Sequence, residues 1–471
     1  MMLLSNLLKI DLPNELDCNI SGLTLDSRAV GNGDVFFALA GTQQHGEVYI
    51  PSSLEKGASA ILTEAPVAGI EQLDGGIPCI SIPNLSEQVG AIAACFYNYP
   101  SDNMQVIGVT GTNGKTSITH AIAHLLQTQN TDCGLLGTLG YGIYGNLKTA
   151  SHTTPDAIRL QALFAELQAS TVAMEVSSHA LVQGRVNAIN FDTAVFTNLS
   201  RDHLDYHKTM QAYGEAKLRL FTMPNLKTAI INSDDIFGQQ ILSNLSSTVT
   251  PLTYSLHDKS ADLYAKIERY DNNGSVFTIQ GEQCYFPWFG EFNISNILAV
   301  LAVLLNMGYS LSELLKKIKN LPAVAGRMER FGSSDQATII IDYSHTPDAL
   351  KQALLTLKQH NTGRLWCVFG CGGDRDKGKR PIMGEIAQTY ADKVIITDDN
   401  PRHETSQSII DDILQGCPKP EAVIANRKQA IEYALQQATV DDIVLIAGKG
   451  HEDYQEIGDQ RLPFSDRELV K

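Results

Sequence analysis

Short apolar runs separated by polar turns and by helical patterns recur along the whole chain. Near the start, residues 35–39 and 58–62 are apolar runs with Gly and Pro nearby. Later runs at residues 172–176 and 191–196 alternate with helical segments. This alternation predicts an α/β protein with a mainly parallel sheet covered by helices on both faces, with function at the ends of the strands.

Two breaks in the pattern predict three domains. After residues 99–103, a strand over residues 105–110 leads into a Gly-rich turn and a helix whose apolar positions are three and four residues apart. A second break at residues 320–322 precedes strands that alternate with helices, at residues 337–341, 365–369, 393–397 and 442–447. We therefore expect an N-terminal α/β domain over residues 1–101, a central parallel-sheet domain over residues 102–322 and a C-terminal Rossmann-like α/β domain over residues 323–471.

Composition narrows the classes of function. The 471 residues carry 52 acidic and 36 basic side chains, a formal charge of −16, which argues against non-specific binding to nucleic acid or anionic membrane. The eight cysteines are scattered without zinc-type CxxC pairs, so we expect reduced thiols. The apolar start is too short for a signal peptide, and no run approaches the ~20 apolar residues of a membrane span. We expect a cytoplasmic protein.

The turn at residues 110–116, TGTNGKT, follows a strand and opens a helix. In this context backbone N–H groups and a helix N-terminus bind phosphate, while a lysine neutralises the outer phosphates and a hydroxyl reaches magnesium. It is not a strict Walker A match, because Val109 occupies the first glycine position. The alternative is a Gly-rich turn without a ligand. The expected ATP-binding residues are Gly111, Thr112, Asn113, Gly114, Lys115, Thr116 and Ser117.

This loop and further segments in order along the chain resemble the ATP-dependent Mur ligases of peptidoglycan synthesis and their folylpolyglutamate synthetase relatives. The similar segments are residues 25–28, 110–116, 151–155, 174–179, 197–205 and 464–467, which span almost the whole chain. The resemblance implies UDP-substrate binding by the first domain, ATP binding by a P-loop ATPase-like central domain and amino-acid binding by the third. It also implies ligation through an acyl phosphate.

A carboxylate attacking the γ-phosphate of ATP brings two anions together, so the site needs Mg²⁺ and cationic groups. We expect Lys115, Glu175, His203 and Lys217 to supply the catalytic set. Glu175 closes an apolar, strand-like run, where a buried carboxylate needs a cation. Its alternative is a surface glutamate on an edge strand.

Two members of that set depend on the resemblance. Taken alone, His203 is more typical of a surface or core histidine, and Lys217 of a solvated lysine on an amphipathic helix. The resemblance implies that His203 contacts a second Mg²⁺ and that CO2 converts Lys217 to a carbamate, which requires a depressed lysine pKa. The implied metal ligands are Thr116, Glu175, His203 and carbamylated Lys217.

His120 and His124 lie four residues apart on the helix after the loop. This spacing could suit a metal, but no third ligand is suggested and the helix already has an apolar face. We expect no metal there.

The binding site for the UDP-linked substrate gives a weak signal from the residues themselves, which form short polar turns after apolar segments. The resemblance implies UDP contacts from Leu25, Ser27, Thr42, Gln43 and Gln44, and muramoyl-peptide contacts from His152, Thr153, Thr154, Ser177, Gln183 and Arg185. Arg185 suits a carboxylate or diphosphate because its guanidinium can bond with two parallel hydrogen bonds.

The resemblance also places Asn296 and Arg327 on the nucleotide side of the site. Asn293, in the same segment as Asn296, has an equally weighted alternative as a helix cap.

Two segments of the third domain bear on the incoming amino acid: the cationic Gly-rich loop at residues 372–380 and Asp-Asn-Pro-Arg at residues 399–402. The latter resembles the signature of family members that add meso-diaminopimelate, whose extra carboxylate favours a cationic partner over an apolar pocket. A solvated loop is the alternative for Arg402. The expected amino-acid ligands are Arg375, Asp399, Asn400, Pro401, Arg402, Gly448 and Glu452.

Together these features predict an ATP-dependent ligase that adds meso-diaminopimelate to a UDP-linked muramoyl dipeptide in cytoplasmic peptidoglycan precursor synthesis. We expect a monomer acting on small molecules, with no nucleic-acid partner. The nearest alternatives are another Mur ligase or a folylpolyglutamate synthetase. From a different class, the phosphate loop alone also fits a P-loop kinase or a nucleotide-dependent switch.

Overall fold

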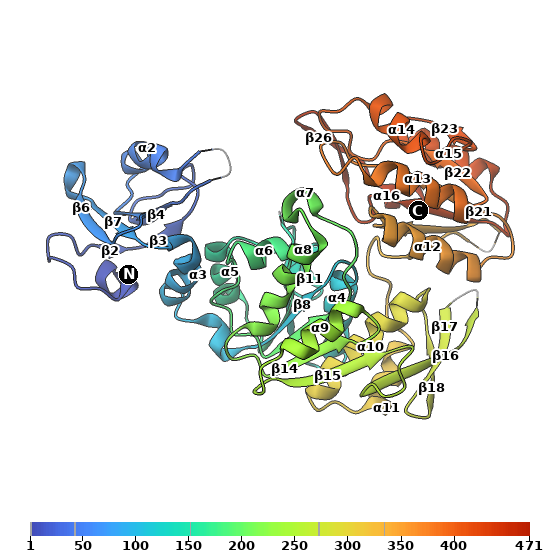
Figure 1. Cartoon of the computed structure of the whole chain (residues 1–471), viewed down its shortest axis with the longest axis horizontal. Coiled ribbons are helices and arrows are strands. Elements are labelled where there is room, and N and C mark those ends of the chain that lie inside the picture. Colours follow the sequence, from blue (N-terminus) through green and yellow to red (C-terminus); the bar gives the residue numbers. More distant parts are fainter. Residues whose placement is uncertain (1, 42–43, 151, 272–273, 334) are drawn as a thin grey trace. The chain divides into compact units, whose positions relative to one another are not determined.

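The computed structural model describes residues 2–41, 44–150, 152–271, 274–333 and 335–471 (Figure 1). The chain forms two compact units. The first contains residues 1–108, 132–192 and 222–226, and the second contains residues 109–131, 193–221 and 227–471.

The N-terminal part of the first unit is a five-stranded sheet whose strand order is β3 (Gly22–Thr24), β4 (Asp34–Ala38), β5 (Ala60–Glu64), β7 (Pro78–Ile82) and β6 (Gly69–Gln72). Only β6 runs antiparallel to its neighbour. Alternate side chains of β4 enter opposite cores, as strand geometry requires. Val35 and Phe37 pack with α1 (Leu4–Leu8) and α3 (Leu85–Phe96), whereas Phe36 packs with α2 (Ile50–Glu55). A short antiparallel pair, β1 (Met2–Leu3) and β2 (Asn19–Ile20), lies at the start.

The rest of the first unit carries five strands in the order β11 (Asn146–Lys148), β10 (Gly140–Ile143), β9 (Cys133–Gly137), β12 (Thr171–Glu175) and β8 (Gln105–Thr110), the last two residues of β8 belonging to the second unit. β9 and β12 are parallel, and β10 and β11 extend this part of the sheet as antiparallel strands. Helix α5 (Ala157–Glu166) packs against α3, and its N-cap Asp156 accepts hydrogen bonds from two backbone N–H groups. Helix α6 (Ser178–Val182) follows β12.

In the second unit, the strand order is β13 (Thr193–Phe196), β14 (Thr228–Asn232), β15 (Thr250–Ser255), β16 (Leu263–Asp271), β17 (Gly274–Ile279) and β18 (Glu282–Phe286). The first four strands are parallel, but β16 to β18 form an antiparallel extension that the sequence pattern did not predict. The helices here are α4 (Lys115–Gln127), α7 (Leu204–His207), α8 (Met210–Leu218), α9 (Ile236–Asn244), α10 (Glu291–Asn306) and α11 (Leu311–Ile318). Helix α10 is buried on most sides and packs against α4, β14, β15 and β16.

The C-terminal sheet has the order β19 (Glu329–Phe331), β20 (Thr338–Asp342), β24 (Ile443–Ala447), β21 (Leu365–Phe369), β22 (Lys393–Ile396) and β23 (Ala422–Val423), all parallel except β19. Ile340 packs beneath α12 (Pro347–Gln359), α13 (Lys379–Tyr390) and α14 (Ser406–Leu414). Its neighbours Ile339 and Ile341 enter the opposite core with α15 (Arg427–Gln437) and residues of α16 (Asp466–Leu469). A hairpin of β25 (Tyr454–Ile457) and β26 (Gln460–Pro463) follows β24. The α/β prediction is confirmed, with helices on both faces of the sheet.

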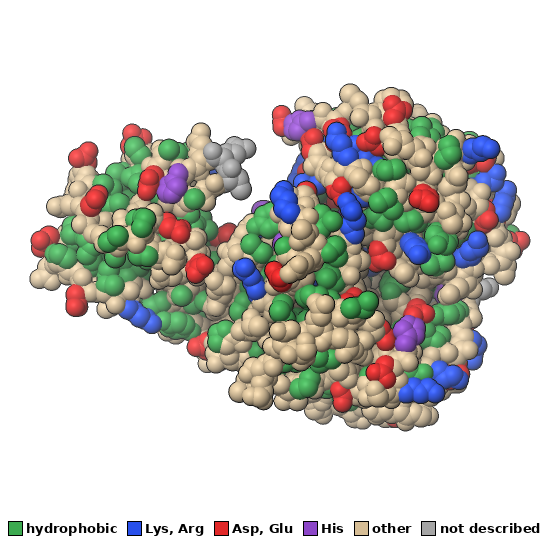
Figure 2. All heavy atoms as spheres, viewed as in Figure 1, with side chains coloured by type: hydrophobic (Ala, Val, Ile, Leu, Met, Phe, Trp, Pro, Cys, Tyr) green, Lys and Arg blue, Asp and Glu red, His purple; other side chains and the backbone are tan. Residues whose placement is uncertain are grey.

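All eight cysteines are free thiols, as expected, and every one lies in the described part of the chain. None of the described helices combines the length and the apolar character that a membrane span requires. On the face drawn in Figure 2, lysines and arginines are interspersed with acidic side chains.

Candidate functional site

Side chains from two other segments pack closely against the two glycines of the phosphate loop. At Gly111, which has φ of 149°, a Cβ atom would lie 1.8 Å from the Thr197 hydroxyl oxygen. At Gly114, with φ of 90°, it would lie 2.5 Å from Asn296 Oδ1. Asn198 fixes the turn between them, because its carbonyl accepts the Thr112 N–H at 2.8 Å and its side chain accepts the Asn113 N–H at 3.0 Å. Glycine is required at both ends of this turn.

Lys115 and Thr116 begin helix α4. The Lys115 ammonium folds back onto the loop, donating to the carbonyls of Gly111 and Thr112, each at 2.9 Å. The Thr116 hydroxyl accepts a hydrogen bond from Arg327 at 3.1 Å. A cation and a helix N-terminus therefore lie at the same turn, which is the arrangement that binds phosphate.

Lys217 lies on the buried face of α8, with 1% of its surface exposed. Burial lowers its pKa well below the usual lysine value, and the nearby Lys115 charge lowers it further, against the opposing effect of Asp202. Tyr213, one turn earlier, donates its hydroxyl hydrogen to the Thr112 hydroxyl at 3.3 Å. The interpretation of Lys217 as a solvated lysine is wrong, because this face of α8 packs toward the phosphate loop rather than toward water.

His203 and Asp202 lie side by side near this loop. His203 has a left-handed backbone, with φ of 53°, and its Nε2 lies 3.4 Å from Asp202 Oδ2. Burial raises the pKa of Asp202, but the charges of His203, His345 and Lys379 outweigh burial and hold it below its usual value. Asp202 is therefore a carboxylate within a cluster of basic groups.

Glu175 ends strand β12 in the first unit with 1% of its surface exposed. Thr138 donates to its carboxylate twice, from the backbone N–H at 2.8 Å and from the hydroxyl at 3.1 Å. The neighbouring backbone is close, since a Cβ atom at Gly137 would lie 2.4 Å from Glu175 Oε1. The alternative of a surface glutamate is wrong, and Glu175 is a buried carboxylate at the end of a parallel strand.

The residues expected to hold the muramoyl peptide meet around Thr154. Its hydroxyl donates to the Glu175 carbonyl at 2.8 Å and accepts the Ser177 N–H at 3.2 Å. Its carbonyl accepts from Arg185 at 2.7 Å, and the same guanidinium bonds Gln183 Oε1 twice. Beside them, the hydroxyls of Thr153 and Thr138 are 3.0 Å apart, and His152 is exposed. The structure thus brings this group together near Glu175.

The positions expected to contact UDP are described in part. Leu25 is partly buried against the N-terminal core, and the Ser27 carbonyl accepts from Lys56 at 2.8 Å. Gln44 accepts a hydrogen bond from Tyr49 at 3.2 Å. Thr42 and Gln43 lie outside the described residues.

On the nucleotide side, Asn296 lies on α10 next to Gly114, and its side-chain amide donates to Asn293 Oδ1 at 3.2 Å. Asn293 donates to the Phe289 carbonyl at 2.9 Å from inside the first turn. The N-cap of α10 is Gly290, so the capping alternative for Asn293 is wrong.

Most of the residues expected to bind the amino acid lie in one partly buried network in the C-terminal domain. Arg402 Nε donates to Glu456 at 2.9 Å, and its NH1 donates to the Gly373 carbonyl at 2.9 Å. Asn400 donates to Glu452 at 2.9 Å. Pro401, which lies between Asn400 and Arg402 in the sequence, is buried. The solvated-loop alternative for Arg402 is wrong, because the hairpin β25–β26 folds over this segment through Glu456. Arg375, in contrast, is exposed.

Gly448 continues this network after β24. Its φ is 117°, and a Cβ atom there would lie 3.3 Å from Asp399 Oδ2. Burial raises the pKa of the Glu452 carboxyl, an effect that the Lys449 charge opposes and the Asp399 charge reinforces. Two acidic side chains therefore share one buried region.

Sequence reasoning missed two buried arginines that hold this domain's loops. Arg427 is fully buried and bonds the Asp466 carboxylate at 2.8 and 2.7 Å. Arg380, in the cationic loop, bonds Glu404 at 3.0 and 2.7 Å and Asp412 at 2.9 Å. The signal available in the sequence was weak, because an arginine and its distant acidic partner carry no characteristic spacing.

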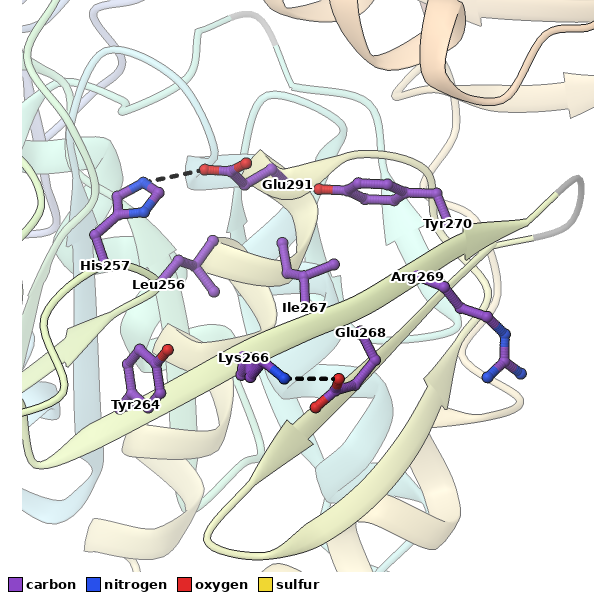
Figure 3. A pocket seen from close by; sticks show the side chains of 9 residues that line it. All are labelled: Leu256, His257, Tyr264, Lys266, Ile267, Glu268, Arg269, Tyr270 and Glu291. Carbon is purple, nitrogen blue, oxygen red and sulfur yellow. Dashed lines mark hydrogen bonds and ion pairs between the residues drawn. The ribbon is translucent and has the colours of Figure 1, made fainter.

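Figure 3 shows a hollow of about 340 Å³ lined by residues of β16 and by the ion pair of His257 and Glu291, 3.1 Å apart. Lys266 and Glu268 point toward one another along the strand, 3.0 Å apart. The hollow contains none of the predicted site residues, and these four side chains form two separate pairs, His257 with Glu291 and Lys266 with Glu268.

In the residues that the structure covers, no three His, Cys, Asp or Glu side chains converge as a ready metal site. Burial lowers the pKa of His120 to about 4, with Arg327 adding to the effect, so His120 is a neutral packed side chain.

Comparison with protein families matches three consecutive ranges. The family models are the Mur ligase family catalytic domain at residues 19–97, the Mur ligase middle domain at residues 109–304 and the Mur ligase glutamate ligase domain at residues 326–450. A Pseudomonas aeruginosa protein named UDP-N-acetylmuramoyl-L-alanyl-D-glutamate--2,6-diaminopimelate ligase is 48% identical over 466 residues, which cover 97% of this chain and 95% of that protein.

Solved structures agree in fold over the whole length. One described as a UDP-N-acetylmuramoyl-L-alanyl-D-glutamate--2,6-diaminopimelate ligase has a TM-score of 0.71 and 37% identity, covering 100% of this chain and 98% of that one. A MurF ligase from Thermotoga maritima in complex with ADP has a TM-score of 0.65, covering 93% and 95%, and at 17% identity shows the fold alone. The three family models and the 48% identical relative show that the chain belongs to the Mur ligase family.

Proposed function

We propose that this protein is an ATP-dependent ligase that joins meso-2,6-diaminopimelate to UDP-N-acetylmuramoyl-L-alanyl-D-glutamate, in cytoplasmic synthesis of peptidoglycan precursors. The main structural support for this chemistry is the buried amine of Lys217, whose pKa is lowered. Lys217 lies on helix α8, which contacts the phosphate loop through Tyr213. The 48% identical Pseudomonas aeruginosa protein, named as this ligase, supports the choice of substrates.

The reaction begins when the substrate carboxylate attacks the γ-phosphate of ATP, forming an acyl phosphate and ADP. The amine of diaminopimelate then displaces phosphate to give the amide. In the first step, the loop N–H groups and Lys115 bind phosphate oxygens and offset the charge that develops on them. Arg327, bonded to Thr116 at 3.1 Å, adds a second cation on the same side.

Mg²⁺, when bound, supplies the positive charge that draws the two anions together. Within the second unit, the proposed ligands are Thr116, His203 and the carbamate of Lys217. A carbamate forms when a neutral amine attacks CO2 and loses a proton, so the depressed pKa of Lys217 fits this modification. The product carries a negative charge where a buried ammonium would be costly beside Lys115.

The amino-acid site of the proposal is the network around residues 399–402, with Arg375 at its edge. Arg402 can bind the distal carboxylate, and Asp399 and Glu452 can bind an ammonium group. We retain residues 1–101, 102–322 and 323–471 as the UDP-substrate, ATP and amino-acid domains of this proposal.

The test is phosphate release from MgATP with UDP-muramoyl dipeptide and either meso-diaminopimelate, L-lysine or no amino acid. Release with diaminopimelate alone supports both the ligase and its specificity. Equal release with lysine keeps the ligase and overturns the role given to Arg402. Phosphate release without any amino acid would favour a nucleotide-dependent switch, and no release in any mixture would remove the proposal.

A further inference from the structure

We infer that Lys449 is a positioning residue for amino-acid selection: its buried ammonium holds Asn400 and Glu452 in the geometry that receives the amino acid. The inference rests on the proposed function, because it concerns the same substrate site. Lys449 itself was not among the residues expected to touch the amino acid. It directly follows Gly448, and none of its surface is exposed.

The Lys449 ammonium lies among three acceptors from two separate loops. It donates to Asn400 Oδ1 at 2.9 Å and to Glu452 Oε2 at 3.1 Å, and it lies 3.6 Å from Asp399 Oδ1. A buried cation with this many partners fixes their positions, since each charge-assisted bond is strong where water is excluded.

Glu452 is oriented from both sides. Its Oε2 accepts from Lys449 and from the Asn400 amide at 2.9 Å, and its Oε1 accepts from the Tyr343 hydroxyl at 3.3 Å. The carboxylate therefore has one orientation before any amino acid arrives. Preorganisation of this kind improves affinity by reducing the cost of ordering the site.

Lys449 is connected to Arg402 by hydrogen bonds that pass through Asn400 and Glu456. Asn400 Oδ1, which Lys449 holds, also accepts the Glu456 N–H at 3.0 Å. The Glu456 carboxylate then accepts Arg402 Nε at 2.9 Å. Loss of the Lys449 ammonium should thus disturb both the carboxylate and the guanidinium ends of the site.

The carboxylates of Asp399 and Glu452 can bind a second cation in addition to Lys449. Lys449 supplies one positive charge beside the two carboxylates of Asp399 and Glu452. Asp399 is 7% exposed, and in the described chain its Oδ1 has no hydrogen-bond partner. A buried carboxylate oxygen without a hydrogen bond destabilises the protein unless a ligand donates a hydrogen bond to it. An ammonium group of the amino-acid substrate has the charge and the donors to do so.

The experiment measures steady-state kinetics for Lys449→Met, which removes charge and donors, and Lys449→Gln, which keeps a donor for Asn400. We expect KM for diaminopimelate to rise by about ten- to hundredfold in the methionine variant and less in the glutamine variant. KM for ATP and for the UDP-muramoyl dipeptide should stay within about twofold, and kcat within about threefold. Lys393→Met is the control, because Lys393 lies on β22 of the C-terminal sheet, pairs with Glu421 at 2.6 Å and makes no contact with the amino-acid network described above.

A purely structural lysine would give a different pattern, in which kcat falls with the fraction of folded enzyme and every KM is unchanged. That pattern, an unchanged KM for diaminopimelate in folded variants, or failure of both variants to fold would overturn the inference. If the unmodified enzyme fails to release phosphate with diaminopimelate, the proposed function fails instead, so the two failures are distinguishable.

Discussion

The Lys217 ammonium nitrogen lies 4.3 Å from the centroid of the Tyr213 ring, on a helix face closed to solvent. The electron-rich ring face is an attractive neighbour for a cation, yet burial and Lys115 still favour the neutral amine. The neutral amine is the form that reacts with CO2.

From this relationship we predict that Lys217→Ala lowers kcat by at least about a hundredfold, the scale of one lost electrostatic contact to the transition state. A short carboxylate such as acetate or formate should restore part of the activity by replacing the carbamate. Lys266→Ala is the control, because Lys266 is a largely exposed lysine paired with Glu268. Near-normal activity of Lys217→Ala would contradict the carbamate.

Arg402→Lys should raise KM for diaminopimelate by about tenfold or more and reduce discrimination against L-lysine, because an ammonium lacks the planar fork. The comparison variant is Arg461→Lys, since Arg461 bonds the other oxygen of the same Glu456 carboxylate at 2.9 Å from an exposed position. Competition between the two amino acids in a single reaction measures the discrimination directly. An unchanged ratio would remove Arg402 from the specificity determinants.

Gly114→Ala should weaken ATP binding by about tenfold or more, from the left-handed backbone and the contact with Asn296 Oδ1 together. Gly281→Ala is the control, because Gly281 also has a left-handed backbone, with φ of 83°, but lies between β17 and β18, outside the phosphate loop. Titration with a non-hydrolysable ATP analogue gives the affinities. Equal ATP affinity in the two variants would argue that the loop tolerates the methyl group.

Asp466→Ala should lower the free energy of unfolding by about 3 to 5 kcal/mol, because it leaves the Arg427 guanidinium buried without its partner. Glu468→Gln removes an exposed pair with Lys471 and should leave stability unchanged within error. Urea unfolding of the two variants provides the comparison. A small loss for Asp466→Ala would mean that the carbonyls of Asp398 and Ala447 suffice for Arg427.

His451 provides a pH-dependent test. Burial lowers its pKa from 6.5 to about 3, with the nearby cations adding to the effect. Between pH 6.5 and pH 3, therefore, His451 binds a proton in the unfolded chain but not in the folded protein. The contribution of neutral His451 to the stability of the fold is complete above pH 6.5 and is lost as pH falls toward 3. We expect Tm of His451→Gln to fall less than that of the unmodified protein between pH 6.5 and 4.5. The exposed His403 serves as the control, and parallel Tm curves would refute the role of His451.

The sequence by itself determined the α/β class, the phosphate loop and the family, because these depend on local order. The loop at residues 110–116 needs its strand, its glycines and its helix start to be consecutive, and β8 and α4 are present as expected. Residues 365–369 likewise form strand β21 as predicted, since an apolar run of that length has few other ways to be buried.

Only the tertiary structure decided which charged side chains are buried, how their pKa values shift and which partners they pair with. Lys217 and Lys449 are buried because of what packs over them from distant segments, and nothing in their immediate neighbours along the chain requires this. A pKa depends on burial and on charges a few ångströms away in space, such as Lys115 beside Lys217. The pairing of Arg427 with Asp466, 39 residues later, arises in the same way, because a long-range ion pair leaves no periodic trace in the sequence.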